Sequence, residues 1–194
     1  MTKEGEVALE SDTTIFGFWI YLMTDLVIFA VLFATFLTMR GNTFGVPSGR
    51  ELFHMPFALA ETLILLISSF TCSLANLAVF RRQRAAALFW FLGTFVLGAS
   101  FLGLELSEFS KLIDQGYSWR ASGFLSSYFA LVGTHGFHIS IGLLWIVIAM
   151  FRIGLRGVGP ATVSRTFRLS LFWHFLDIVW VFIFTVVYAM GHLL

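Results

Sequence analysis

The stretch IFGFWIYLMTDLVIFAVLFATFLTM, from Ile15 to Met39, decides the fold class. It is 25 residues long and has Asp25 as its single charged side chain, whereas about 20 apolar residues are enough for a helix to cross a bilayer. The stretch shows no alternation of apolar and polar residues, which argues against a strand of a membrane β-barrel. It therefore predicts a transmembrane helix.

Four further stretches of the same kind define the domain organisation. They cover Phe57–Phe80, Ala85–Leu106, Phe124–Phe151 and Leu169–Met190. No connection or tail outside the five stretches is longer than 17 residues, so no soluble domain fits between them. We predict an all-α, polytopic membrane protein with a tail at residues 1–14 and one antiparallel five-helix domain at residues 15–194. The short connection between the second and third spans predicts a tight hairpin.

The composition excludes several classes of protein. Of the 194 residues, 58% are hydrophobic and 12% are charged, against about 25% charged in ordinary soluble domains, and the mean hydropathy is +0.89. The 12 lysines and arginines against 11 acidic residues leave no basic surface for nucleic acid. Cys72, the single cysteine, lies in an apolar run, where it is expected to pack as a small hydrophobic residue. A soluble enzyme and a nucleic-acid-binding protein are therefore excluded.

The basic residues that flank the spans predict the orientation in the membrane. Eight lie on one side, namely Lys3, Arg81, Arg82, Arg84, Arg152, Arg156, Arg165 and Arg168. Four lie on the other side, namely Arg40, Arg50, Lys111 and Arg120. Because cytoplasmic connections carry an excess of lysine and arginine, we predict a cytoplasmic N-terminus and a periplasmic C-terminus.

Eight ionisable residues lie within or at the edge of the predicted spans. They are Asp25, Glu61, Glu105, Glu108, His135, His138, His174 and Asp177. Ionisable groups are costly in hydrocarbon, so they face a protein interior, a cavity or a partner. Three pairs have the spacing i,i+3 that puts both members on one helix face, namely Glu105/Glu108, His135/His138 and His174/Asp177. Their positions place the three glutamates near the outer face and Asp25, His135, His138 and Asp177 nearer the midplane.

Three kinds of chemistry are open to these residues: a metal or haem site, a proton relay, or a polar network that fixes helix packing or binds lipid head groups. Di-iron bundles use Glu-x-x-His motifs, which this sequence lacks, and a bis-histidine haem would need His135 or His138 to face His174. We therefore predict no metal site and no catalytic residue, and a buried polar network or lipid cleft instead. Asp177 is expected to pair with His174 or a histidine of the fourth span, because pairing offsets the cost of burial.

Four motifs occur together along the chain. They are GFWIYLMTD at 17–25, FLGLELSEF at 101–109, SGFLSSYFALVGTHGFH at 122–138 and LFWHFLDIVW at 171–180. In combination they resemble subunit III of the haem-copper terminal oxidases, and the resemblance covers nearly all of the chain from Ile15 to Gly191. The five spans are similar to the bacterial form, which lacks the first two of seven spans. The first span and Phe172–Gly191 are most similar to the subunits of cytochrome bo-type ubiquinol oxidases.

This resemblance implies a non-catalytic subunit of a proton-pumping oxidase of the bacterial inner membrane, which oxidises ubiquinol and reduces oxygen to water. It implies that the haems and copper belong to subunit I and that the partners are subunits I, II and IV. It also implies a V-shaped bundle whose cleft holds phospholipid, and a role in the assembly and stability of subunit I. Asp25 matches the buried acid of the family that reacts with carbodiimides. The positions that match the helix-packing and lipid-cleft region are Glu105, Glu108, His135, His138, His174 and Asp177.

Three alternatives stay open at this point. The chain could serve the same role in a cytochrome c oxidase, or be a small transporter with a path of buried carboxylates, or a membrane enzyme with its own metal. Transporters often have inverted repeats and spans broken by glycine or proline. The three prolines, Pro47, Pro56 and Pro160, all lie outside the predicted spans, and no repeat is present. The sequence therefore favours the oxidase subunit.

Overall fold

The computed structural model describes residues 3–42 and 55–189, and every regular element in these ranges is a helix. The elements are α1 (Lys3–Met39), α3 (Met55–Phe80), α4 (Arg84–Asp114), α5 (Gly123–Arg156) and α6 (Pro160–Ile183), followed directly by the π-helix η1 (Phe184–Ala189). Five helices, with α6 and η1 counted as one, are long and apolar enough to cross a membrane. The prediction of an all-α, five-span membrane protein is therefore confirmed.

The helices extend beyond the apolar stretches that predicted them. Helix α4 ends at Asp114 rather than Leu106, and α6 begins at Pro160 rather than Leu169. Helix α1 begins at Lys3, so helical backbone continues into the segment predicted as a tail. Hydropathy marks only the part of a helix that lies in hydrocarbon, while the backbone stays helical until a cap or a proline ends it. Arg50 and the segment after Ala189 lie outside the described residues.

The turn after α3 shows how the predicted hairpin is closed. The backbone N–H of Gln83 donates to the carbonyl of Ala78 (2.9 Å) and that of Arg82 to Val79 (3.0 Å). This pair of bonds is a Schellman motif, whose penultimate residue has a left-handed conformation that usually requires glycine. Arg82 occupies this position with φ +55°, whereas Gly116 occupies it after α4 with φ +87°. The hairpin between α3 and α4 is therefore confirmed, and it is made with a residue that strains the turn.

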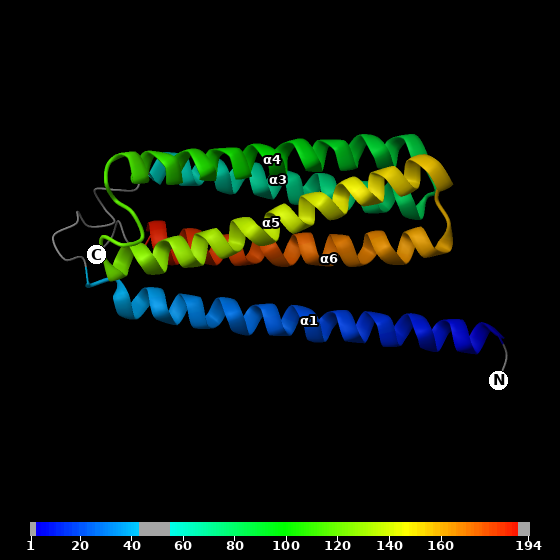
Figure 1. Ribbon diagram of the computed structural model, residues 1–194. Helices are drawn as coiled ribbons and strands as arrows, with labels where there is room; N and C mark the ends of the chain where they lie inside the picture. Colours follow the sequence, from blue (N-terminus) through cyan, green and yellow to red (C-terminus); the bar gives the residue numbers. More distant parts are fainter. Residues whose placement is uncertain (1–2, 43–54, 190–194) are drawn as a thin grey trace.

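Helices α3 and α4 lie side by side along their length, and α5 crosses from α4 toward α6 (Figure 1). Helix α1 lies on the opposite edge of the bundle and contacts α5 and α6 (Figure 1). In the most apolar 18-residue stretch of α1, 22% of the residues are buried, whereas 44% are buried in the corresponding stretches of α3 and of the α6–η1 span. Helix α1 is thus the helix most exposed to the surroundings of the chain. The V shape and the orientation in the membrane stay predictions.

Trp173 of α6 lies at the point where four helices meet. A Cβ atom on Gly98 of α4 would lie 2.8 Å from its Cη2 atom, and one on Gly142 of α5 would lie 2.8 Å from its Cζ3 atom. The indole Nε1 donates a hydrogen bond to Ser68 Oγ of α3 at 3.1 Å. The two glycines therefore let α4 and α5 approach closely enough to enclose the ring, as small residues do between membrane helices.

The last turn of the α6–η1 span is a π-helix rather than an α-helix. In a π-helix each N–H bonds to the carbonyl five residues earlier, which adds a residue to the turn. Within η1, Val187 and Tyr188 are buried. The changed winding therefore directs the phenol of Tyr188 into the bundle.

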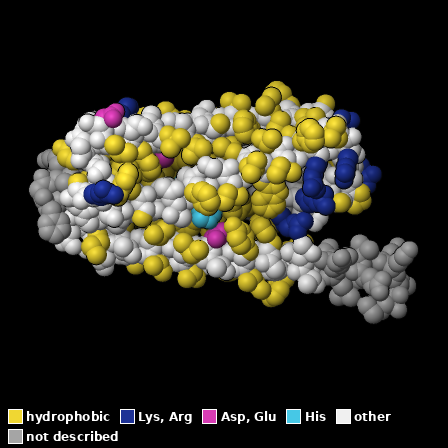
Figure 2. Space-filling model, in the orientation of Figure 1, with side chains coloured by type: hydrophobic (Ala, Val, Ile, Leu, Met, Phe, Trp, Pro, Cys, Tyr) yellow, Lys and Arg dark blue, Asp and Glu magenta, His cyan; other side chains and the backbone are white. Residues whose placement is uncertain are grey.

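The surface of the described chain is apolar along its length and positively charged at one end (Figure 2). This end carries the α3–α4 and α5–α6 connections, where Arg84 donates a hydrogen bond to the carbonyl of Gly154. The arginines of this end are Arg81, Arg82, Arg84, Arg152, Arg156, Arg165 and Arg168. The start of α1 lies at the same end (Figure 1). Seven of the eight basic residues that were counted on one side of the membrane, all except Lys3, therefore lie at one end of the described bundle.

Candidate functional site

The eight ionisable residues lie in three groups at different places in the bundle. The first joins α1 to α5 and contains Asp25 and His138, with His135 next to them. The second joins α3 to α4 and contains Glu61, Glu105 and Glu108. The third joins α6 to α3 and contains His174 and Asp177. All eight side chains are buried or half-buried.

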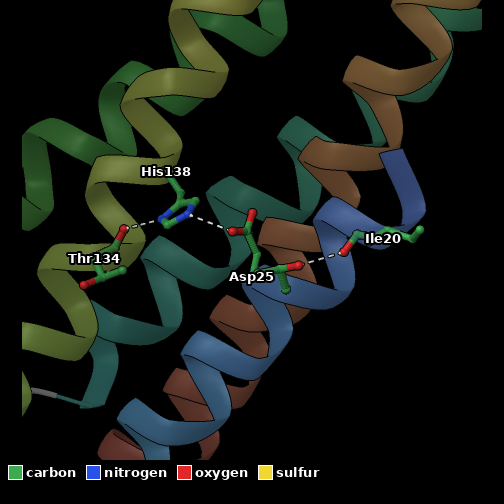
Figure 3. A network of polar contacts seen from close by, with 5 residues as sticks. Ile20, Asp25, Thr134 and His138 are labelled. Atoms are coloured by element: carbon green, nitrogen blue, oxygen red, sulfur yellow. Dashed lines mark hydrogen bonds and ion pairs between the residues drawn. The ribbon is translucent and has the colours of Figure 1, made fainter. Parts of the chain in front are cut away.

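The first group links α1 to α5 through one ion pair (Figure 3). His138 Nδ1 donates to the carbonyl of Thr134 at 2.8 Å, which leaves Nε2 directed at Asp25. The distance from Nε2 to Asp25 Oδ1 is 3.8 Å, too long for a hydrogen bond, so the contact is electrostatic. Both side chains are almost fully buried, with 11% and 7% of their side-chain surfaces exposed. It is the only ion pair within the described ranges of the chain.

His135 shares a helix face with His138, as its spacing predicted, because both rings contact Phe29 of α1. Its ring stacks on Trp180 with centroids 5.3 Å apart and meets Phe101 edge to face. Neither ring nitrogen of His135 has a hydrogen-bond partner among the described residues. The ring is therefore held by aromatic packing and does not face His174.

The third group corrects one prediction. His174 Nδ1 lies 2.6 Å from Ser69 Oγ, and its Nε2 lies 3.1 Å from Ser73 Oγ. The hydroxyl of Ser73 also donates to the carbonyl of Ser69, so its oxygen can accept a hydrogen bond from the Nε2–H group of His174. Both ring nitrogens of His174 are thus satisfied by serines of α3.

The prediction that Asp177 pairs with a histidine is therefore wrong. Its Oδ1 atom is buried and has no hydrogen-bond partner within residues 3–42 and 55–189, and no ion pair to Asp177 is found in these ranges. The physical reason is the neighbouring helix. Ser69 and Ser73 are spaced to meet the two nitrogens of His174, so the ring turns toward α3 instead of toward Asp177.

The second group brings three carboxyl groups together near one end of the bundle. One carboxylate oxygen from each of Glu61, Glu105 and Glu108 lies within 4.8 Å of the others. Tyr188 of η1 donates to Glu108 Oε2 at 3.3 Å, and its hydroxyl lies 3.1 Å from that of Tyr128 of α5. The prediction that Glu105 and Glu108 share a helix face is confirmed, and the structure adds that Glu61 of α3 lies beside them.

Tyr128 and Tyr188 were not predicted as members of this group. A signal was present, because a buried tyrosine hydroxyl usually needs a partner and both residues lie within the predicted apolar stretches. Ser69 and Ser73 were likewise not predicted as partners of a histidine. Hydroxyl groups of tyrosine and serine are therefore part of two of the three groups of polar side chains.

A cavity of about 370 Å³ lies between α1, α5 and α6 at the arginine-rich end. Its apolar wall includes Phe18 and Trp145. Its basic residues are Arg152, Arg156, Arg165 and Arg168. An anion bound there would meet several guanidinium groups, whose planar forks suit phosphate.

Comparison with known proteins identifies the class of protein that this fold represents. The family described as cytochrome c oxidase subunit III matches residues 5–192, nearly the whole chain. The chain belongs to this family, and the resemblance drawn from its four motifs is confirmed. It is a multi-pass membrane protein that serves as an accessory subunit III of a terminal oxidase, in a complex with other oxidase subunits.

Individual relatives are similar over most of their length. Subunit 3 of the cytochrome bo(3) ubiquinol oxidase of Pseudomonas aeruginosa is 51% identical over 180 residues, which cover 93% of this chain and 86% of the relative. The corresponding subunit of Pseudomonas putida is 49% identical over 92% of this chain and 86% of the relative. Cytochrome c oxidase subunit 3 of Bacillus sp. strain PS3 is 44% identical over 97% of this chain and 91% of the relative.

Proposed function

We propose that the chain is a non-catalytic subunit of a ubiquinol-oxidising, proton-pumping oxidase of a bacterial inner membrane. Its partners are then subunits I, II and IV, and the haems and copper are in subunit I. The two Pseudomonas relatives, whose names specify ubiquinol oxidase, support ubiquinol as the electron donor. The same role in a cytochrome c oxidase is the alternative, which the Bacillus relative supports at a lower identity.

The arrangement of the histidines supports the proposal that this chain binds no redox metal. A bis-histidine haem needs two imidazoles on opposed helices with their nitrogens directed at one iron. In the described chain, His138 is engaged by Thr134 and Asp25, and His174 by two serines. His135 is enclosed by aromatic rings. These three histidines are therefore committed to packing and hydrogen bonding rather than to a common ligand.

A tagged purification tests this assignment. The complex is isolated in mild detergent through a tag on this chain, and its subunits are identified by mass spectrometry. We expect co-purifying subunits, haem absorption bands, and faster oxygen consumption with ubiquinol than with reduced cytochrome c. After the subunits are separated, iron and copper should stay with the others. Iron or copper bound in equal amount to this chain would contradict the proposal.

The arginine-lined cavity supports phospholipid as a further partner. Its mixed lining of Phe18, Trp145 and guanidinium groups suits an anionic head group with an attached acyl chain. Lipid mass spectrometry of the purified complex should show retained anionic phospholipid that decreases in an Arg165→Gln, Arg168→Gln double variant. Arg120→Gln, at the opposite end, is the control and should retain the lipid. Equal lipid content in all three preparations would refute the cavity as a lipid site.

The orientation is tested with reporter fusions. An excess of basic residues predicts that a reporter fused near Arg82 is active in the cytoplasm and one fused after Leu194 is active in the periplasm. The opposite pattern would reverse the orientation without changing the fold.

A further inference from the structure

We propose that Glu61, Glu105 and Glu108 bind one divalent cation of the calcium type between α3 and α4. Hard divalent cations prefer oxygen ligands, and a carboxylate from each of three residues is a common part of such sites. This site is separate from the haems and copper expected in the partner subunits. It also departs from the prediction of no metal, which rested on ligand sets that contain histidine.

The spacing of the three carboxylates fits such an ion. Calcium lies about 2.3–2.6 Å from its oxygen ligands, so two ligands on opposite sides of it are about 4.6–5.2 Å apart. The ligand oxygens of Glu61, Glu105 and Glu108 all lie within 4.8 Å of one another. Small rotations of the three side chains therefore bring one oxygen of each within reach of a single ion, without a change in the helices.

Unpartnered oxygens are a second observation that points to a ligand. Glu61 is 0% and Glu105 is 2% exposed, and all four of their carboxylate oxygens are buried without a hydrogen-bond donor in the described ranges. Buried charges are normally paired or coordinate a metal, because an isolated ion is very costly to remove from water. No ion pair to these two residues is found among the described side chains. A bound cation would satisfy the four oxygens together.

The surroundings supply the remaining parts of the site. Glu108 keeps the hydrogen bond from Tyr188, which fixes its carboxylate while one oxygen is directed at the cluster. Glu105 also lines a cavity of about 300 Å³ between α4 and α5, beside Gly133 and Gly136, which leaves room for water to complete the coordination. Glu61 lies six residues after the start of α3 and Glu108 six residues before the end of α4, so the site is about 9 Å from the helix ends.

Protons are the competing explanation for the cluster. If the carboxyl groups are neutralised by protons alone, they need no cation and share hydrogen bonds among themselves. The two explanations differ in what a chelator does. Removal of a cation frees carboxyl groups that take up protons in the buried site and then react with a carbodiimide, whereas a chelator leaves a protonated cluster unchanged.

The first experiment counts ions in the intact oxidase complex. The complex is treated with EDTA, desalted and titrated with Mn²⁺ or Ca²⁺, and the bound ion is measured by EPR and elemental analysis. We expect wild type to bind one ion more per complex than Glu105→Gln or Glu61→Gln. Mutation of an outer-shell partner of a metal typically costs about 10–100-fold in affinity, so loss of a direct carboxylate ligand should weaken binding by at least about tenfold. Asp114→Asn, an exposed acid at the end of α4, is the control and should bind as wild type does.

The second experiment uses only the wild-type complex, so it does not depend on whether a variant assembles. A hydrophobic carbodiimide is added with Ca²⁺ or with EDTA, and peptide mass spectrometry locates the modified acids. We expect modification of Glu105 only after EDTA treatment, while Asp25, which lies in a different group, reacts equally in both. Equal modification of Glu105 with and without Ca²⁺, or equal ion content in wild type and Glu105→Gln, would overturn the cation site in favour of protons.

Discussion

Helix α1 and the block formed by α3, α4, α5 and α6 are held together in different ways. Within the block, side chains bond directly between helices: Trp180 Nε1 donates to Thr62 at 3.1 Å, and the hydroxyls of Thr71 and Thr94 lie 2.9 Å apart. Helix α1 packs instead through a narrow stripe. Its buried members are Leu22, Asp25, Phe29 and Phe36, which are one or two helical turns apart, and Asp25 adds the ion pair with His138.

The difference shows which forces set helix association in this protein. Lipid tails are as apolar as leucine side chains, so apolar contact alone gives little preference for another helix over lipid. The block gains close backbone approach and hydrogen bonds, whereas α1 gains a row of aromatic contacts and one ion pair. We expect the block to resist disruption and α1 to be the helix that separates first.

The largest expected effect is on the block. Trp173→Ala removes the ring of α6 that contacts α3, α4 and α5, together with its bond to Ser68, and replacement of a buried tryptophan by alanine costs about 3–5 kcal/mol. Unfolding of the purified chain by SDS in mixed micelles measures the loss. Trp119→Ala is the control, because Trp119 is 52% exposed and its loss should change stability little. Equal effects of the two changes would show that Trp173 does not hold the block together.

A smaller effect on the same contact is expected from Gly98→Ala. The added methyl group would lie 2.8 Å from the ring of Trp173, and overpacking of this kind costs about 1–3 kcal/mol. Gly93→Ala on the same helix is the matched control, since a Cβ there meets nothing within 4 Å. The same unfolding assay should separate the two variants. If Gly98→Ala is as stable as Gly93→Ala, the close approach of α4 to α6 is not tight.

The attachment of α1 is expected to be weaker. A double-mutant cycle with Asp25→Asn and His138→Gln should give a coupling free energy of about 0.6–1.7 kcal/mol. These values are the average and the maximum of about 0.6 and 1.7 kcal/mol measured for polar contacts between membrane helices. Subunit retention on blue-native gels and oxygen consumption test the consequence. Asp25→Asn should leave oxygen reduction largely intact in assembled complexes. Loss of oxygen reduction in a fully assembled complex would contradict the non-catalytic role.

The smallest effect is expected for Asp177→Asn. Because Asp177 pairs with no histidine, the change should cost less than the roughly 0.6 kcal/mol average of polar contacts between membrane helices. Ser69→Ala, which removes the partner of His174 Nδ1, should reduce stability more. Blue-native gels report assembly for both variants. A larger defect in Asp177→Asn than in Ser69→Ala would restore the ion pair that the sequence suggested.

The sequence predicted the elements of this fold well because lipid imposes a simple requirement on them. A helix satisfies its own backbone groups, so an apolar run long enough to cross the bilayer has few other structures available. The same logic located the eight ionisable residues and the face shared by Glu105 and Glu108. The helix ends were predicted less well, because caps such as Ser122, which accepts from the N–H of Leu125, lie outside the apolar runs.

The partners of the buried residues could not be predicted in the same way. Which side chains meet depends on the rotation of each helix about its axis, and hydropathy that is high on every face does not define that rotation. His174 illustrates the point, since i,i+3 spacing put Asp177 beside it on the same face, but two serines of another helix meet its ring. The niche that Gly98 and Gly142 form for Trp173 depends in the same way on three helices at once.

The π-helix η1 has a consequence for how this chain tolerates changes in length. Each residue of an α-helix advances the chain by about 100°, so the extra residue in the π turn rotates all that follows by that angle. If the same residues were wound as an α-helix, Tyr188 would lie about 100° from its present direction and would face away from Glu108. Deletion of one residue within Phe184–Val187 would instead let the span become α-helical throughout with Tyr188 still on the face that meets Glu108. A single deletion at the π turn should thus keep the hydrogen bond at 3.3 Å between Tyr188 and Glu108, whereas a single deletion in the α-helical part of α6 should break it. In this span, the number of residues before Tyr188 therefore sets the direction in which its side chain points.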